Sequence, residues 1–194
     1  MTSKPQHNSS IHIQAASKEE IRDKGKDIVI TYGIADSPFG KCFIALNSHR
    51  ICALQFSDNT TTALSDLQAL YPKAKFHEDI SLTQQVANLI FTSNQAEDFT
   101  LWVHGTPFQI NVWETLIQIP YGKLISYENL ANLSGNPKAV RASASAVARN
   151  PIAFLIPCHR VIRKNGNIGE YRWGKNLKKR MIEWEKTTSY LPVL

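Results

Sequence analysis

The chain of 194 residues has little cysteine: Cys42, Cys52 and Cys158 are its three, and no two of them form a C-x-x-C pair. An odd number without paired spacing argues against a disulfide framework and a cysteine zinc site, and is typical of a reducing cytosol. No apolar run approaches the roughly 20 residues that a membrane span needs. Residues 1–10 lack the apolar core of a secretory signal. We therefore expect a cytoplasmic protein without a metal or a membrane partner.

The charge is unevenly distributed along the chain. Residues 1–100 carry a net charge of −2, whereas residues 101–194 carry +8, within a total of +6. This asymmetry indicates that the C-terminal half meets a polyanion. A solvated basic surface without a partner is an equally open interpretation.

The first half predicts a small α/β domain. Residues 1–27 are polar, with few large apolar side chains, so we expect a flexible tail with one weak helical turn at 18–22. From residue 28 onward, β-branched and apolar runs predict strands and spaced apolar residues predict helices. The expected strands are 28–32, 42–46, 51–56 and 99–103, and the expected helices are 60–71 and 82–92. We expect a small antiparallel sheet with helices over residues 28–103.

The second half, residues 104–194, predicts a mostly α-helical domain. Capping residues, prolines and apolar stripes place helices at 106–119, 127–133, 137–149 and 175–186. The middle two are short and joined by a turn that contains Gly135, which is typical of a helix-turn-helix. A helical hairpin of another kind fits the same pattern.

The second helix of this pair has one basic face. Lys138, Arg141, Ser145 and Arg149 fall within about 80° of each other at helical periodicity, and Val140 and Val147 lie on the opposite side. The face has no Asn, Gln or Glu to hydrogen-bond base edges in a major groove. This composition favours sequence-independent docking on double-stranded DNA, in the minor groove.

Residues 156–161, Ile-Pro-Cys-His-Arg-Val, place a thiol beside a base between apolar runs. A thiolate is the nucleophilic form of cysteine, so a group that takes the thiol proton decides the chemistry. Cys158 and His159 are therefore candidates for a nucleophile and its base. A buried structural cysteine beside a surface histidine is the simpler alternative.

The last predicted helix places Glu185 close to its apolar stripe, where an unpaired carboxylate is costly. Glu185 could orient and charge a histidine, as the third member of a nucleophile–base–orienter set. Alternatively, it reaches solvent or pairs with Lys178 on the same side of the helix.

These motifs, in order, resemble the O6-alkylguanine-DNA alkyltransferases, and in pattern the alkyltransferase part of bacterial adaptive-response proteins. The matching stretches are 36–40, 105–109, 119–122, 126–127, 136–142, 150–151, 156–161, 169–174 and the helix that ends at Glu185. They run through the whole C-terminal half. The resemblance implies repair of double-stranded DNA by irreversible transfer of an alkyl group, mainly methyl, from O6 of guanine to a cysteine. It also implies some action on O4 of thymine, no cofactor, and a monomer.

The resemblance also implies a role for individual residues. Cys158 would accept the alkyl group, with His159 as its base and Glu185 behind the imidazole. Tyr127 would donate a proton to the leaving guanine and help to push the nucleotide's phosphate, and Arg141 would replace the flipped base. The extruded base would meet a pocket of further residues: Val147, Asn150, Val161, Tyr171, Arg172 and Trp173.

Two departures and two alternatives accompany this resemblance. Ile28, Asn47 and Cys52 stand where some relatives have zinc ligands, so no zinc is expected. Trp173 stands where some relatives have a small residue, so we expect methyl to be preferred over bulky adducts. A module that binds alkylated bases without chemistry would lack a nucleophile at Cys158. A cysteine hydrolase would turn over acyl substrates and be indifferent to DNA.

Overall fold

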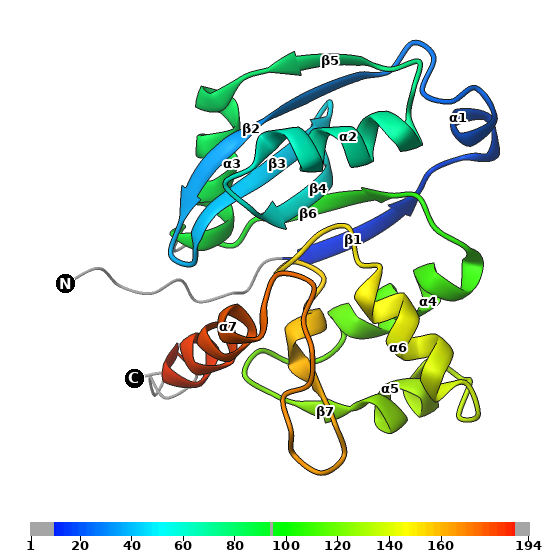
Figure 1. The fold of residues 1–194 in the computed structure, drawn as a ribbon, viewed down its shortest axis with the longest axis vertical. Coiled ribbons are helices and arrows are strands. Elements are labelled where there is room, and N and C mark those ends of the chain that lie inside the picture. The colour runs from blue at the N-terminus through cyan, green and yellow to red at the C-terminus, as the bar shows by residue number, and fades with distance from the viewer. Residues whose placement is uncertain (1–9, 94, 189–194) are drawn as a thin grey trace.

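In the computed structural model, which describes residues 10–93 and 95–188, a sheet with three helices lies above a helical half (Figure 1). The strands are β1 Ser10–Ala15, β2 Val29–Ser37, β3 Gly40–Asn47, β4 Arg50–Phe56, β5 Lys75–Glu78, β6 Asp98–Val103, β7 Ile125–Ser126 and β8 Val161–Ile162. The helices are α1 Lys18–Arg22, α2 Thr60–Leu70, α3 Ile80–Phe91, α4 Pro107–Ile117, α5 Tyr127–Leu133, α6 Val140–Ala148 and α7 Lys175–Thr188, with a single 3-10 turn, η1 Cys158–Arg160.

The central sheet is mixed, and in the described part of the chain it has six strands in the order β1-β6-β4-β3-β2-β5. Strands β2, β3 and β4 form the expected antiparallel meander. Its first turn has Gly40 at φ 111°, a backbone conformation that glycine adopts without steric cost. The expectation of a small antiparallel sheet was wrong for the remainder, because β1–β6, β2–β5 and β4–β6 are parallel pairs. Parallel partners are joined by long crossovers, which local patterns do not reveal.

The expectation of a flexible tail was wrong for residues 10–27. Strand β1 pairs with β6 from Ser10↔Asp98 to Ala15↔Val103, and α1 follows with a capping box between Ser17 and Glu20. Only Ile11 and Ile13 mark β1 as a strand, and both pack against the core. Two apolar residues were too few to predict a strand from the sequence. The strand forms because it pairs with β6, about 90 residues away in the chain. Residues 1–9 lie outside the described part of the chain.

Helices cover both faces of the sheet. Helix α2 buries Ala63 and Leu67 on one face, in a cluster that contains Cys52. Helix α3 and the helical half cover the other face, where Cys42 is buried. Burial raises the pKa of both thiols to about 12, so both stay protonated and act as small core residues.

The helical half shares a core with the sheet instead of forming its own. One buried cluster extends from Leu54 on β4 through Trp113 on α4 to Met181 on α7. The chain that follows α6 is also joined to β4: Leu54 donates its N–H to the carbonyl of Pro151, and Ala153 donates to the carbonyl of Leu54. The segment that leads to Cys158 is thereby fixed against a central strand.

Helix α6 begins later than predicted. Pro137 was expected to open it, but the helix starts at Val140 after a turn in which Ala139 donates its N–H to the carbonyl of Asn136. Lys138 therefore precedes the helix, and Arg149 caps its C-terminal end. Helices α5 and α6 pack against each other and against α4, below the sheet in Figure 1.

Candidate active site

The turn that presents the candidate nucleophile is held by one buried asparagine. Oδ1 of Asn150 accepts a hydrogen bond from the N–H of Ile152 at 2.9 Å. Nδ2 of Asn150 donates a hydrogen bond to the carbonyl of Ile156 at 2.9 Å. The same Nδ2 lies 3.1 Å from Sγ of Cys158. Phe154, between these anchors, has φ 66°, which is unfavourable for a non-glycine residue. The asparagine thus folds the segment back and donates a hydrogen bond to the sulfur.

A buried imidazole and carboxylate lie directly behind this turn. Nε2 of His159 lies 2.7 Å from Oε1 of Glu185, and both side chains are almost inaccessible to solvent. The carboxylate also accepts hydrogen bonds from the Arg160 guanidinium at 2.9–3.1 Å and from the Gly122 N–H at 3.0 Å. Since a carboxylate accepts, Nε2 of neutral His159 carries the proton and Nδ1 is free to accept one.

The surroundings set the protonation states of these groups. Burial lowers the pKa of His159 more than Glu185 raises it, so the imidazole is neutral at rest. Burial alone would raise the pKa of Glu185, but hydrogen bonds from His159 and Arg160 and the positive charge of Arg160 outweigh it and lower the pKa to about 2. Glu185 is therefore ionised. Nδ1 of His159 is buried and has no hydrogen-bond partner among the described residues.

Burial raises the pKa of the Cys158 thiol, while hydrogen bonds from Asn150 and Tyr171 and the charge of Lys178 oppose that rise. Since a buried thiol resists ionisation, a base must take its proton before it can attack. His159 follows Cys158 in the same 3-10 turn and has an acceptor nitrogen. The site therefore has the parts of a nucleophile, a base and an orienting carboxylate.

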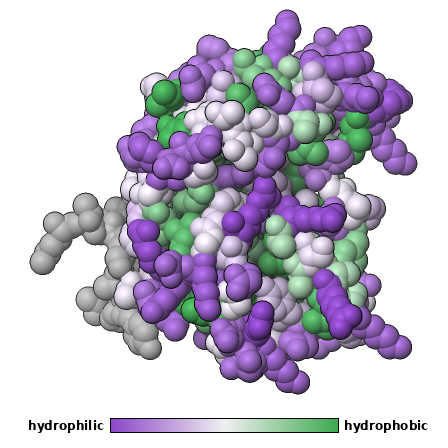
Figure 2. Space-filling view, viewed as in Figure 1, coloured by the Kyte–Doolittle hydropathy of each residue, from purple (hydrophilic) through white to green (hydrophobic). Residues whose placement is uncertain are grey.

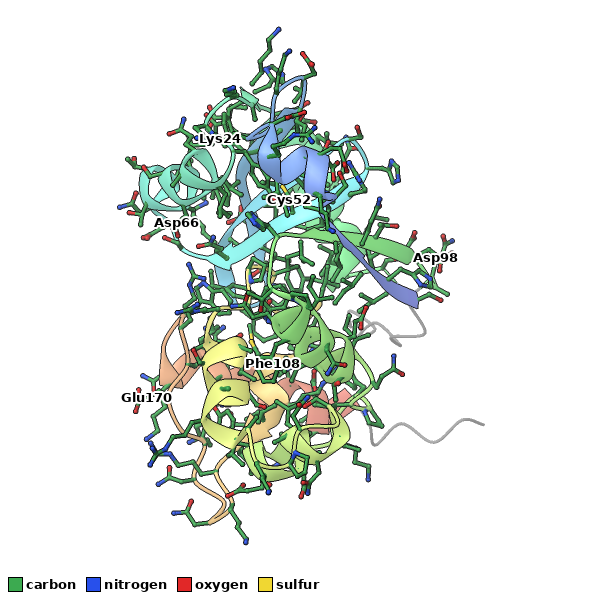
Figure 3. The ribbon with its side chains drawn as sticks, turned by 90° about the vertical axis from the view of Figure 1, so that its right-hand side faces the viewer. Lys24, Cys52, Asp66, Asp98, Phe108 and Glu170 are labelled. Atoms are coloured by element: carbon green, nitrogen blue, oxygen red, sulfur yellow. The ribbon has the colours of Figure 1, made fainter. Side chains whose placement is uncertain are left out.

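A pocket of about 900 Å³ opens onto Cys158. Its walls come from α5, α6, the segment 163–173 and α7. Among its lining residues are Tyr127, Val140, Arg141, Val147, Cys158, Arg163, Lys164, Glu170, Tyr171, Arg172, Trp173 and Lys178. Burial raises the pKa of Tyr127, and the charge of Cys158 adds to this, so its hydroxyl remains a proton donor. Glu170 lies at the lower left of Figure 3, below Asp66 of α2.

The outer side of α6 is basic and exposed. Lys138, Arg141, Ser145 and Arg149 are all exposed, whereas Ser143, Ala146 and Val147 are buried. Figure 2 shows that hydrophilic side chains surround smaller apolar areas on the face of the helical half that it views. Arg141 belongs both to this basic side and to the pocket wall.

Comparison with known proteins gives a consistent identity for both halves. The model of the 6-O-methylguanine DNA methyltransferase DNA-binding domain matches residues 107–187. The model of the ribonuclease-like domain of the same methyltransferases matches residues 30–96. The methylated-DNA–protein-cysteine methyltransferase of Mycobacterium bovis is 34% identical over 165 residues, which cover 82% of this chain and 94% of that protein.

The chain belongs to the 6-O-methylguanine DNA methyltransferase family. The bifunctional transcriptional activator/DNA repair enzyme Ada of Escherichia coli is 39% identical over 171 residues, 86% of this chain. The match covers 48% of Ada, so the chain spans about half the length of that relative.

Solved structures of this methyltransferase family have the same fold. The Mycobacterium tuberculosis O6-methylguanine methyltransferase aligns with a TM-score of 0.67 at 30% identity, over 85% of this chain and 96% of that chain. The M. tuberculosis OGT in complex with DNA aligns with a TM-score of 0.63 at 29% identity, over 82% and 94%. A mixed sheet above a helical C-terminal region is thus the fold of the family.

Most of the residues that the methyltransferase resemblance singles out meet at one place. Tyr127, Arg141, Val147, Cys158, Tyr171, Arg172 and Trp173 all line the pocket. Asn150 and Val161 are fully buried and do not line it; Asn150 contacts the sulfur, and Val161 offers its carbonyl to Lys178. Lys138, Ser145 and Arg149 lie outside the pocket lining. Val140 and Val147, predicted to lie opposite the basic residues of α6, both line the pocket together with Arg141.

Sequence reasoning missed two charged residues of the site. Arg160 holds both oxygens of Glu185, and its Nη1 donates to the carbonyl of Ile119 at 2.6 Å. Lys178 does not pair with Glu185, as one interpretation had it, but lies buried beside the pocket. Arg160 could have been found from its position directly after His159 in the sequence. Nothing in the sequence marked Lys178, because lysine on a helix usually faces water.

None of the helices in the described residues is long and apolar enough to cross a membrane. Within residues 10–93 and 95–188, no three His, Cys, Asp or Glu side chains come together in a way that could hold a metal ion.

Proposed function

We propose that this protein repairs DNA by direct reversal, transferring an alkyl group, mainly methyl, irreversibly from O6 of guanine to Sγ of Cys158. The arrangement of Cys158 supports this best: its sulfur lies at a pocket, with His159 and Glu185 behind it and the basic α6 at the rim. The M. bovis relative is a methylated-DNA–protein-cysteine methyltransferase, and the M. tuberculosis OGT forms a complex with DNA, which supports this proposal.

The reaction begins with the thiol proton. His159 accepts it through a bound water at Nδ1, and Glu185 stabilises the imidazolium that results. The thiolate attacks the alkyl carbon, a C–S bond forms, and the C–O6 bond breaks with its electron pair moving to guanine. The Tyr127 hydroxyl donates a proton to the leaving base, and the proton held by the His159 imidazolium returns to the tyrosinate through solvent. Because a thioether has no ready leaving group, each molecule acts once.

DNA docks through α5 and α6, which act as a helix-turn-helix. The alkylated guanine is inaccessible within the stacked duplex, so it is extruded at a cost of a few kcal/mol. Arg141 fills the space that the base leaves, while Lys138, Ser145 and Arg149 approach sugar and phosphate in the minor groove. These contacts carry no base readout, so docking is independent of sequence.

The extruded base enters the pocket between α6 and segment 163–173, where Val147, Tyr171, Arg172 and Trp173 contact it. Asn150 and Val161 shape that pocket from behind. We propose that an O4-alkylated thymine, whose ring is smaller than that of guanine, enters the same pocket and transfers its alkyl group to Cys158.

We further propose a division of labour between two parts, with residues 28–103 as a scaffold and residues 104–194 as the DNA-binding and alkyl-transfer part. The protein acts as a monomer, since one chain contains every group that the reaction needs. Its three free cysteines support a place in the reducing cytoplasm.

Intact-mass measurement after mixing with duplex DNA that contains O6-methylguanine tests the proposal. One transferred methyl adds ~14 Da to the protein, with no second addition at excess substrate. Cys158→Ala should show no gain, whereas Cys42→Ala and Cys52→Ala, which remove buried thiols of the sheet, should show it in full. Turnover beyond one methyl per protein, or a methyl on another residue, would refute the mechanism.

A further inference from the structure

We propose that Phe154 is a positioning residue for the base of the site: its ring lies flat against one face of the His159 imidazole and shields that face from water. The inference rests on the proposed function, in which His159 takes the thiol proton. Phe154 acts through His159, since it does not line the pocket that opens onto Cys158.

The two rings are stacked inside the protein. Their centres lie 5.8 Å apart and their planes differ by 12°, which is the offset parallel arrangement that aromatic pairs favour. Phe154 is 6% exposed and His159 is 0% exposed. The hydrogen bond from Nε2 to Glu185 lies at the edge of the imidazole. Phe154 therefore contacts the imidazole where hydrogen bonds do not form, on its flat face.

An unusual backbone turn brings the Phe154 ring to this place. The Leu155 N–H donates to the carbonyl of Ala153 at 2.8 Å, and Phe154 lies between them with φ 66°. A three-residue turn with a positive φ at its centre is a γ-turn of the rare and strained kind. Such strain persists only where the surrounding structure fixes it, and it is concentrated at functional sites. Here the strained residue is the one that covers the base.

The Phe154 ring also separates the imidazole from a hollow of about 180 Å³. Phe154, Leu155, Pro157 and Arg160 are among the residues that line this hollow, whereas His159 does not line it. Loss of the ring would extend the hollow to the imidazole face. A polar ring nitrogen and the Arg160 guanidinium would then offer partners to an entering water.

The Phe154 ring is supported from the sheet. Phe39, in the turn between β2 and β3, has its ring centre 5.6 Å from that of Phe154 and 5.4 Å from that of Trp184, which precedes Glu185 on α7. The Phe91 ring of α3 lies 4.9 Å from Phe154. The sheet thereby supports the side chain that covers the base and contacts the helix that carries the base's carboxylate.

The cover matters because burial is the largest cause of the lowered pKa of His159. The titratable and charged groups that face the imidazole are Cys158 and Arg160 of its own turn, Lys178 and Glu185 of α7, and Tyr121, whose ring lies 5.3 Å from the Arg160 guanidinium. Phe154 adds no charge to this set. Its replacement by an aliphatic residue therefore changes the hydration of the imidazole and leaves the charged groups in place.

The test compares Phe154→Ala, which removes the cover, with Phe154→Leu, which keeps an apolar side chain against the imidazole. Phe43→Ala is the matched control: Phe43 is 0% exposed on β3, in the core cluster on the other face of the sheet, and its ring stacks on Tyr32. The His159 imidazole is titrated by nuclear magnetic resonance of labelled histidine, with His159→Asn to assign its signals. Single-turnover methyl transfer from O6-methylguanine duplex is followed over the same pH range.

We expect Phe154→Ala to raise the pKa of His159 by about one unit, because water then reaches the face that the ring covered. The base must be neutral to take a proton, so the acid limb of the transfer profile should move to higher pH. Transfer on that limb should slow about tenfold, and the difference should shrink above the raised pKa. Phe154→Leu should restore most of the rate, and Phe43→Ala should match the unsubstituted protein.

An unchanged imidazole titration in folded Phe154→Ala, or an equal shift in Phe43→Ala, would overturn the proposal. If none of the proteins transfers methyl, the proposed function fails, while the titration still decides the role of Phe154.

The stacked contact is also observable without the reaction and without a large cavity. A stacked aromatic ring shifts the resonances of the carbon-bound imidazole hydrogens. Phe154→Leu should move these resonances of His159, whereas Phe43→Leu should leave them in place. Unmoved resonances in Phe154→Leu would exclude the contact, so this measurement decides the proposal if Phe154→Ala does not fold.

Discussion

Oδ2 of Asp66 lies 3.1 Å from Nη2 of Arg172, and this ion pair joins α2, on the sheet, to the segment that walls the pocket. The Arg172 guanidinium also lies 5.7 Å from the centre of the Trp173 ring, and Trp173 meets Phe56 of β4 edge-on at 6.4 Å. The pocket wall is therefore attached to the sheet at one charged contact and one aromatic contact.

The charged contact should contribute little to stability. The Arg172 and Asp66 side chains are 36% and 51% exposed, so the pair is screened and Asp66→Asn should cost at most about 1 kcal/mol of unfolding free energy. Urea denaturation measures this, with Asp23→Asn as a control that removes the exposed Arg22–Asp23 pair. A loss above about 2 kcal/mol would mean that the contact organises the wall.

Trp173 should limit the size of the transferred group. It lines the pocket, packed against Tyr171 at 5.2 Å between ring centres. Trp173→Ala should speed transfer of a benzyl group relative to methyl by about tenfold or more, since each removed aromatic contact frees space for the adduct. Competition between O6-benzylguanine and O6-methylguanine substrates measures the ratio. Equal rates of methyl and benzyl transfer in the unsubstituted protein would contradict this role.

Asn150 should matter for both stability and reactivity. Asn150→Ala removes its bonds to Ile152, Ile156 and Sγ of Cys158. The buried N–H of Ile152 loses its partner, whereas the Ile156 carbonyl still accepts the Cys158 N–H. We expect a loss of about 3 kcal/mol in urea unfolding and slower methyl transfer. Asn47→Ala is the control, because the buried Nδ2 of Asn47 has no hydrogen-bond partner among the described residues. Similar losses in both variants would contradict the assigned role.

Glu185 should make the protein sensitive to acid. Its pKa is lowered from an ordinary 4.5 to about 2, so it stabilises the fold above pH 4.5, and this stability is lost as the pH falls toward 2. The linked free energy is about 3 kcal/mol. Unfolding measured between pH 2 and 6 should show a shallower loss in Glu185→Gln, and an unchanged slope in Glu183→Gln, whose carboxylate is exposed. If stability fell equally steeply with pH in the unsubstituted protein, Glu185→Gln and Glu183→Gln, the lowered pKa of Glu185 would be refuted.

Arg141 should act on duplex DNA and not on the chemical step. Because Arg141 is proposed to hold the base out, Arg141→Ala should slow repair of duplex at least tenfold while transfer from free O6-methylguanine changes little. Single-turnover rates on the two substrates measure this. Lys138→Ala is the comparison: it removes an exposed charge outside the pocket and should weaken duplex binding in a salt-dependent way. Equal losses on both substrates for Arg141→Ala would contradict its role.

Local patterns predicted much of the secondary structure because capping, proline and apolar spacing act over a few residues. The strands at 42–46 and 51–56 and the helices at 127–133 and 175–186 were found within one to two residues of β3, β4, α5 and α7. Strands β1 and β5 and the two-residue strands β7 and β8 were missed, because each is held by a partner far along the chain. Their pairing, and hence the mixed sheet, depends on long-range contacts.

The reactive groups were evident from the order of the residues: a thiol next to an imidazole at Cys158, a basic side on α6, and a carboxylate near the apolar stripe of α7. The partner of that carboxylate became clear in the folded chain, where Glu185 meets His159 and Arg160 while Lys178 binds the Val161 carbonyl. The identity and periodicity of residues are local properties. Burial and charge pairing arise where segments far apart in the chain are packed together.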